Sequence, residues 1–169
     1  MCIRDRLERG QIGRKAGAGF YRVQKFDDGS RKTEIYDLIQ GSWRDSKKAR
    51  VDEEHAGPRA MFINDEHGRL AWSITGTTLL YAADLVPEIA DDVVNVDRAM
   101  KWGYAWNWGP FELLDEVGPA NVIAKLEAEG HALPKMLQVL KGARADSFYR
   151  GGGQEYFGLD GQYHATPEE

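Results

Sequence analysis

The chain has 169 residues, of which 42% are hydrophobic and 11% aromatic, and this is enough for one domain with a sizeable core. Its mean hydropathy of -0.54 and the lack of an apolar run of bilayer length exclude a membrane span. The net charge of -5 argues against a nucleic-acid partner, because phosphate binding needs clustered lysine and arginine. The single cysteine, Cys2, cannot form an internal disulfide and is typical of a reducing compartment, so we expect a cytoplasmic protein.

The first six residues read Met-Cys-Ile-Arg-Asp-Arg, which resembles the translation of a transposase adapter end used in DNA library preparation. We therefore expect residues 1–6 to be an artefact and the natural protein to begin near Leu7, inside a domain. Leu7 to Ile12 is typical of the end of a helix. The glycine-rich stretch from Gly13 to Gly19 follows, and it contains too much glycine for a regular element.

A β-hairpin is predicted next. Residues 20–25 and 33–38 carry the aromatic and β-branched content of strands, and Asp27 to Ser30 supplies the turn between them. Residues 7–40 are therefore expected to be the end of a first helical unit plus a hairpin. Residues 41–67 are polar and weakly patterned, which indicates a connector with a short strand or helical turn.

Helices dominate the rest of the chain. The longest is predicted from Gly68 to Leu85, with one buried face at three- and four-residue steps. That face comprises Leu70, Ile74, Thr77, Thr78, Tyr81 and Leu85. Further helices are expected from Asn95 to Gly103, from Gly109 to Val117, from Pro119 to Gly130 and from Pro134 to Gly142.

Strand and turn signals return after the last of these helices. Phe20-Tyr21-Arg22 recurs there as Phe148-Tyr149-Arg150, which suggests the end of one repeat followed by a whole second repeat. Residues 68–165 are accordingly expected to be a second helical unit with a terminal β-hairpin. The predicted fold class is mainly α, with small β-hairpins at its two ends.

Taken one at a time, the sequence motifs do not identify a chemical activity. The stretch from Gly13 to Gly19 invites a phosphate-loop interpretation, but its lysine precedes Gly17 and its strand follows rather than precedes the loop. A helix C-cap with a sharp turn into the strand is the favoured interpretation, although Arg14 and Lys15 could still contact an anion such as a CoA phosphate.

Acidic and aromatic clusters also have two interpretations each. The acidic cluster of Glu88, Asp91, Asp92 and Asp97 lacks the spacing of a calcium loop, and helix capping is favoured over a metal site. The aromatic cluster of Trp102, Tyr104, Trp106 and Trp108 could line an acyl or adenine pocket, but core packing is favoured. The histidines, His55, His67, His131 and His164, lie in polar segments without metal-ligand spacing, so no metal site is expected.

Two segments together resemble one family. The segment from Gly13 to Tyr21 resembles the loop that ends the first C-terminal helical unit of 3-hydroxyacyl-CoA dehydrogenases. Residues 96–103 and 108–118 resemble the signature of the second unit, and residues 87–92 fit the longer forms, which often carry an enoyl-CoA hydratase domain. The residues that carry the resemblance are Gly13, Arg14, Lys15, Gly17, Gly19, Phe20, Tyr21, Asp97, Arg98, Lys101, Gly103, Gly109, Pro110 and Phe111.

The resemblance implies hydride transfer from the 3-hydroxyl carbon of an acyl-CoA to NAD in fatty-acid β-oxidation. No position here matches the family's histidine base, its glutamate partner or its dinucleotide fingerprint. We therefore expect NAD and catalysis in a preceding N-terminal domain, and no catalytic, cofactor-binding or metal residue in this chain, which alone would be inactive.

The implied partners are acyl-CoA bound through the parent enzyme, the rest of the parent chain, and a second copy in a homo-oligomer. Within the motif, Arg98 or Lys101 is expected to pair with Asp115 or Glu112 across the turn between helices. The alternative is a stand-alone helical assembly or acyl-CoA-binding module without catalytic function.

Overall fold

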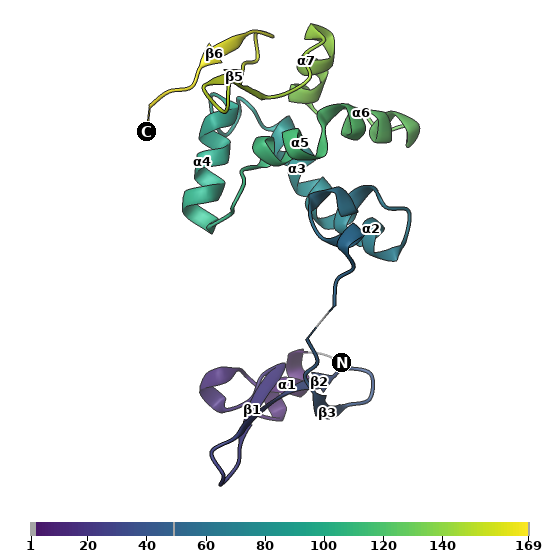
Figure 1. The fold of residues 1–169 in the computed structure, drawn as a ribbon, viewed down its shortest axis with the longest axis vertical. Helices are drawn as coiled ribbons and strands as arrows, with labels where there is room; N and C mark the ends of the chain where they lie inside the picture. The colour runs from purple at the N-terminus through teal and green to yellow at the C-terminus, as the bar shows by residue number, and fades with distance from the viewer. Residues whose placement is uncertain (1–2, 49, 169) are drawn as a thin grey trace. The chain divides into compact units, whose positions relative to one another are not determined.

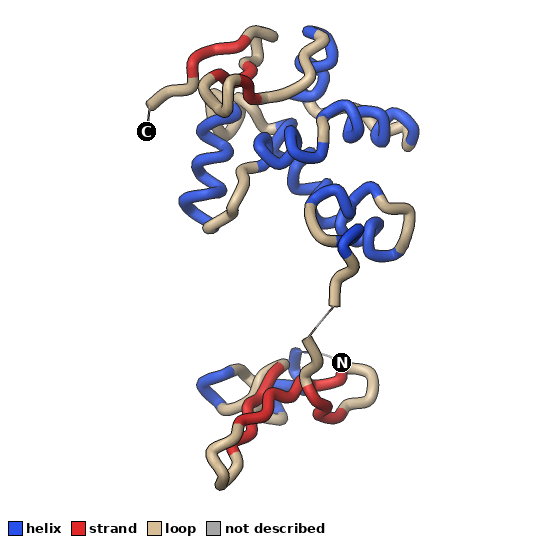
Figure 2. Tube along the Cα trace, viewed as in Figure 1, coloured by secondary structure: helices blue, strands red, loops and turns tan. Residues whose placement is uncertain are grey.

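The computed structural model describes residues 3–48 and 50–168. The chain divides into two compact units, Met1–Arg50 (unit 1) and Val51–Glu169 (unit 2). Unit 1 consists mainly of strands and loops, whereas most of the helices lie in unit 2 (Figures 1 and 2). The predicted mainly α fold with small β elements is thus confirmed.

Unit 1 is a small antiparallel sheet preceded by short helical turns. Its elements are α1 (Ile3–Glu8), the 3-10 turn η1 (Arg14–Ala16), β1 (Tyr21–Lys25), β2 (Arg31–Asp37) and β3 (Ser42–Asp45). The hairpin of β1 and β2 forms as predicted, and the Asp28 carboxylate accepts a hydrogen bond from the Ser30 amide at 2.8 Å in its turn. The strand β3 pairs with β2 and turns the hairpin into a three-stranded sheet.

Cationic and aromatic side chains make many of the contacts in unit 1. The Arg6 guanidinium lies 3.7 Å from the centre of the Phe20 ring, so one of the residues set aside as an artefact packs against the sheet. Arg22 donates to Glu34 at 2.6 Å and lies over the Trp43 ring at 4.4 Å. Polar and cation–π contacts therefore provide much of the stabilisation of this sheet.

Unit 2 begins with short helical turns and continues through a set of packed helices. Its first elements are η2 (Glu53–His55), η3 (Pro58–Phe62), α2 (Glu66–Ala71), the π-helical turn η4 (Trp72–Gly76) and α3 (Thr77–Asp84). The later helices are α4 (Val93–Tyr104), α5 (Pro110–Val117), α6 (Pro119–Ala128) and α7 (Lys135–Ala143). A second antiparallel sheet closes the unit with β4 (Tyr149–Arg150), β5 (Glu155–Phe157) and β6 (Tyr163–Ala165).

The prediction of which side of the helix from α2 to α3 is buried was wrong. Leu70, Ile74 and Tyr81 are each about three-fifths exposed or more. The buried side is formed instead by Leu79, Ala82, Ala83 and Val86. Both stripes repeat at three- and four-residue steps, so periodicity alone could not choose between them. The wide π-helical turn at η4 further shifts the helical phase.

The core of unit 2 lies between the later helices and the second sheet. As predicted, Phe111, Leu114 and Val117 of α5 point into the core, and so do Val122 and Leu126 of α6. Met136, Leu137 and Leu140 of α7 join them, together with Phe148, just before β4, and Phe157 of β5. Within residues 3–48 and 50–168, no helix is long and apolar enough to cross a membrane.

Candidate functional site

The motif residues of unit 2 meet where α4 passes the start of α5. The helix α4 begins at Val93, and Asp92 rather than Asn95 is its N-cap, because the Asp92 carboxylate accepts the Asn95 amide at 2.8 Å. It ends one residue after Gly103, at Tyr104, with Ala105 in the left-handed conformation at a φ of 56°. These boundaries correct the predicted ones and place Asp97 in the middle of the helix rather than at its first turn.

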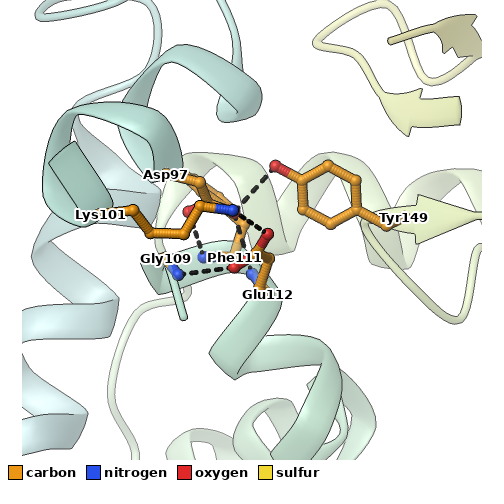
Figure 3. Close-up of polar contacts among 6 residues, drawn as sticks. All are labelled: Asp97, Lys101, Gly109, Phe111, Glu112 and Tyr149. Atoms are coloured by element: carbon orange, nitrogen blue, oxygen red, sulfur yellow. Dashed lines mark hydrogen bonds and ion pairs between the residues drawn. The ribbon is translucent and has the colours of Figure 1, made fainter. Parts of the chain in front are cut away.

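Asp97 fastens the N-terminus of α5 to α4. One of its carboxylate oxygens accepts the Phe111 amide at 2.8 Å, and the other accepts the Glu112 amide at 3.0 Å. The second oxygen also accepts the Tyr149 hydroxyl at 2.8 Å, which brings β4 into the same network (Figure 3). Asp97 therefore satisfies amide groups that the first turn of a helix leaves without a helical partner.

Close approach explains why glycine precedes α5. A Cβ atom on Gly109 would lie 2.2 Å from both Cβ and Cγ of Asp97, so any side chain there would push the two helices apart. Pro110 follows at the first helical position, where its fixed φ suits the helix and its missing amide costs nothing. Phe111 is fully buried and packs edge-on against Phe148, with ring centres 4.9 Å apart.

Glu112 completes this helix start. Its carboxylate accepts the Gly109 amide at 2.8 Å and the Lys101 ammonium at 2.6 Å (Figure 3). One of the expected ion pairs across the turn is thus formed, between Lys101 and Glu112. Arg98 pairs with neither predicted acid; it donates to the Pro167 carbonyl at 2.6 Å and lies 5.8 Å from the Trp102 ring centre.

Burial raises the pKa of Asp97 and of Asp115. The pKa of Asp97 rises to about 7, because desolvation outweighs the hydrogen bonds from Phe111, Tyr149 and Glu112 that favour the charged form. Desolvation also raises the pKa of Asp115 to about 6, against hydrogen bonds from the Phe148 and Tyr149 amides. The pKa of Tyr149 is raised as well, by its own burial and then by the adjacent Asp97.

A pocket of about 480 Å³ opens beside the network. Its cationic lining residues are Arg98 and Lys101, and Trp108 adds an aromatic wall. Its acidic lining residues are Asp97, Glu112, Asp115 and Glu116. The pocket therefore carries more acidic than basic groups, which disfavours an anionic ligand.

The aromatic cluster forms neither the core nor an enclosed pocket. Trp102 is 65% exposed, Tyr104 is 74% exposed and Trp108 is 48% exposed. Of these, Trp108 lines the pocket beside Asp97. The favoured interpretation of core packing is wrong, because the cluster lies at the exposed end of α4 and in the loop after it.

The other motif residues lie in unit 1, within the turn that leads into β1. The Gly13 amide donates to the Ala18 carbonyl at 2.8 Å and closes a loop around η1. Gly17 ends that turn with a φ of 82°, a conformation that favours glycine. Arg14 and Lys15 are exposed on the loop. Gly19 approaches Gly13, since a Cβ there would lie 3.1 Å from the Gly13 Cα.

Tyr149 is the member of the network that motif analysis missed as a site residue. It belongs to β4, far along the chain from Asp97, and only the repeat of Phe20-Tyr21-Arg22 singled it out. Asp115, considered only as an ion-pair partner, instead holds β4 through two backbone amides. Among the described residues of this network, every Asp97 oxygen is engaged, so the arrangement joins helices and sheet rather than presenting a reactive group.

Comparison with known proteins agrees with the two motifs. The chain is 35% identical, over 98% of its length, to a protein of Bacillus subtilis (strain 168) named as a probable 3-hydroxyacyl-CoA dehydrogenase. It is 34% identical over 64% of its length to a protein of Rickettsia felis named as a fatty acid oxidation complex trifunctional enzyme. A Rickettsia prowazekii protein of the same name is 30% identical over 64% of the chain.

The matched regions are short parts of these relatives. The chain spans 22% of the length of the Bacillus protein and 15% of each Rickettsia protein. No family model matches the chain, and no solved structure matches it. The chain thus matches a limited region of larger proteins. Over nearly its whole length the chain resembles a region of a protein named as a 3-hydroxyacyl-CoA dehydrogenase, as its motifs predicted.

Proposed function

We propose that this chain supplies the substrate-side and assembly part of a cytoplasmic, NAD-dependent 3-hydroxyacyl-CoA dehydrogenase of fatty-acid β-oxidation. In this proposal NAD and the hydride-transfer residues belong to another domain of the parent chain. The acyl-CoA substrate is handled through the parent enzyme. The observation that carries the proposal is the Asp97 network, which links the family motif into one helix-to-helix junction.

The network supports a scaffolding role rather than a catalytic one. A general acid or base must reach the proton it transfers. Asp97 is 1% exposed, and both of its oxygens already accept hydrogen bonds from the chain itself. Lys101 is held by Glu112, so its charge is compensated within the network. These groups hold α4, α5 and β4 in a fixed arrangement. Such a rigid arrangement would support the geometry of an acyl-CoA site in the parent enzyme.

The exposed apolar residues on α2, η4 and α3 are expected to mediate self-association or contact with the parent chain. Leu70, Ile74 and Tyr81 lie at helical spacing and are exposed together. Exposed apolar patches of this kind mark interaction surfaces. Light scattering on the purified chain should show species larger than a monomer, and a Leu70→Glu, Ile74→Glu variant should shift the distribution towards the monomer. A monomer at high concentration would contradict this part of the proposal.

The alternative is a stand-alone acyl-CoA-binding module. The pocket beside Asp97 offers Arg98, Lys101 and Trp108, which could hold phosphate and adenine groups. Its four acidic lining residues outnumber the two basic ones and would repel the phosphates of CoA. The charge balance of the pocket therefore favours the scaffolding role.

Activity and binding assays on the purified chain separate these functions. We expect no NADH formation from NAD and 3-hydroxybutyryl-CoA, and no heat of binding when acyl-CoA is titrated into the chain. Turnover would refute the assignment of catalysis to another domain. Binding that is weakened by Arg98→Gln, but not by Arg14→Gln on the unit 1 loop, would favour the acyl-CoA-binding module.

Sequencing the genomic DNA on both sides of the reading frame tests the link to a parent enzyme. The proposal expects an upstream strand, glycine-rich turn and helix of the dinucleotide-binding type. Flanking sequence without such a domain would leave a separate helical module and overturn the proposal.

A further inference from the structure

A second cluster of titratable side chains lies at the start of α2, in elements that the proposed function does not use. It consists of His55 at the end of η2, Asp65 at the N-cap of α2, and His67 in the first turn of α2. The His55 Nε2 atom lies 2.7 Å from an Asp65 carboxylate oxygen. The rings of His55 and His67 meet edge-on, with centres 5.3 Å apart.

These three side chains each place a potential metal-binding atom close to those of the other two. One nitrogen from each histidine and one Asp65 oxygen all lie within 4.8 Å of one another. In a tetrahedral zinc site, with bonds of about 2.0–2.2 Å, two ligand atoms lie about 3.3 Å apart. An ion therefore requires His55 and Asp65 to separate slightly and His67 to move inwards. His67 is exposed, so its ring has room for that movement.

The Asp65 carboxylate is already oriented by the backbone. Its Oδ1 accepts the Gly68 amide at 2.7 Å, which caps α2 and leaves Oδ2 directed at His55. Gly68 is itself tightly packed, because a Cβ there would lie 2.0 Å from the Ile63 carbonyl oxygen. A fixed helix start with an outer hydrogen bond to the ligating carboxylate is the kind of support that metal ligands commonly have.

The two ring nitrogens of His55 face different acids. Its Nε2 lies 2.7 Å from Asp65, whereas its Nδ1 lies 3.8 Å from a Glu54 carboxylate oxygen, beyond hydrogen-bond distance. The side chain of His55 is only 16% exposed, whereas the side chain of Asp65 is 37% exposed. An ion held by these three residues would keep one coordination position open towards solvent, since His67 lies at the surface.

We propose that His55, Asp65 and His67 bind one divalent transition-metal ion of the zinc class, which ties the turn η2 to the N-terminus of α2. Two imidazoles and one carboxylate suit zinc, cobalt, nickel or copper, whereas magnesium and calcium require oxygen ligands. The ion would close the loop that contains η3, a segment of short helical turns ahead of the main helices. This site is independent of the dehydrogenase proposal and of the Asp97 network.

Sequence spacing alone did not reveal the cluster. Asp65 and His67 are near neighbours, but His55 comes ten residues before Asp65, and the intervening η3 packs against both η2 and α2. His164 provides an internal comparison, because its Nε2 lies 3.0 Å from each oxygen of Asp160. Among the described residues, this histidine–aspartate pair has no third ligand beside it, whereas His55 and Asp65 have His67.

Calorimetric titration of the full, untagged chain with Zn²⁺ is the direct test. The chain should carry Cys2→Ser throughout, so that its thiol does not compete for the ion. We expect one Zn²⁺ per chain, with Mg²⁺ giving no binding. Titration with Co²⁺ should give the visible absorption of a four-coordinate ion. The variant His67→Asn should lower Zn²⁺ affinity at least about tenfold, because changes even around a ligand can cost that much.

The matched control is His164→Asn, which removes a histidine from a histidine–aspartate pair but not from the proposed site. It should retain the affinity of the parent chain. Because His67 is exposed, His67→Asn should fold, and circular dichroism checks this. Zn²⁺ should also raise the thermal midpoint of the parent chain but not of His67→Asn. Equal affinity in the parent chain and His67→Asn, or no Zn²⁺ binding at all, would overturn the proposal.

Discussion

The two units of this chain differ in how many apolar side chains they bury. Among the described residues, Tyr36 is the buried hydrophobic residue of unit 1, while Phe20 and Val23 are more than half exposed and Ile39 is 98% exposed. Unit 2 instead buries a continuous cluster that runs from α3 through α7 into the second sheet. Burial of apolar area is the main source of folding free energy. Unit 2 should therefore contribute nearly all of the free energy of unfolding of the chain.

Removing a core ring should show this difference most strongly. Phe111→Ala empties a site of zero exposure beside Phe148, and we expect a loss of about 3–5 kcal/mol in the free energy of unfolding. The matched change in unit 1 is Phe26→Ala, at a ring that is 47% exposed, and we expect about 0.5 kcal/mol or less. Urea denaturation followed by circular dichroism measures both. Similar losses at the two positions would contradict the proposed imbalance between the units.

Two glycines of the family motif should respond in opposite directions. Gly109→Ala places a Cβ within 2.2 Å of Asp97, and we expect a loss of about 1–3 kcal/mol as α5 moves away from α4. Gly103→Ala lies inside α4 with nothing within 4 Å, so we expect a gain of about 0.5–1 kcal/mol from the better helix former. Thermal denaturation compares the two variants. A neutral Gly109→Ala would show that the close approach to Asp97 is not needed.

The buried acids of unit 2 predict an unusual dependence of stability on pH. Because burial raises the pKa of Asp97 to about 7, the folded chain binds its proton more tightly than the unfolded chain, whose aspartate pKa is 3.8. This contribution is complete below the unfolded pKa and is lost as the pH rises towards 7. Asp115, with a pKa of about 6, acts in the same direction.

The unfolding free energy should therefore fall between about pH 5 and about pH 7, by at most about 1.4 kcal/mol per pH unit for one group. Asp97→Asn should reduce this slope when urea midpoints are measured across the range. Asp28→Asn in unit 1 is the control, because the ordinary aspartate pKa of 3.8 already lies below this range and hydrogen bonds from Ser30 lower the pKa of Asp28 further. Asp65 raises the pKa of His55, so His55 also makes the unfolding free energy fall as the pH rises. This effect is the same in both variants. An unchanged slope in Asp97→Asn would refute the role of Asp97.

Much of unit 2 could be predicted from the sequence because proline and glycine mark its helix boundaries. Pro110 and Pro119 begin α5 and α6, and the apolar residues after each proline are buried as the periodicity indicated. The start of α4 was misplaced because Asp92 and Asn95 are both good caps, and only the fold selects Asp92. In α2 and α3 two apolar stripes competed, and packing against α5 and α7 selected the one containing Leu79.

Only those contacts of the candidate site that join residues close together in the sequence could be predicted. The pair of Lys101 and Glu112 was anticipated because a short turn joins their helices. The hydrogen bond from Tyr149 to Asp97 joins residues that are far apart along the chain, and local pattern carries no information about it. The exposed Trp102 shows the same limit, since aromatic content predicts burial only when the packing partner is known.

The smallest effect is expected at the ion pair of the motif. Lys101 and Glu112 approach to 2.6 Å, but their side chains remain 32% and 30% exposed, so Lys101→Ala should cost about 0.2–1 kcal/mol. The control Lys141→Ala breaks the more exposed pair with Glu127 and should cost less. Denaturation at low and high salt measures both losses, and the loss at Lys101 should shrink with salt. A loss at Lys101 as large as that of Gly109→Ala would show that this ion pair, rather than close packing around Asp97, holds α4 against α5.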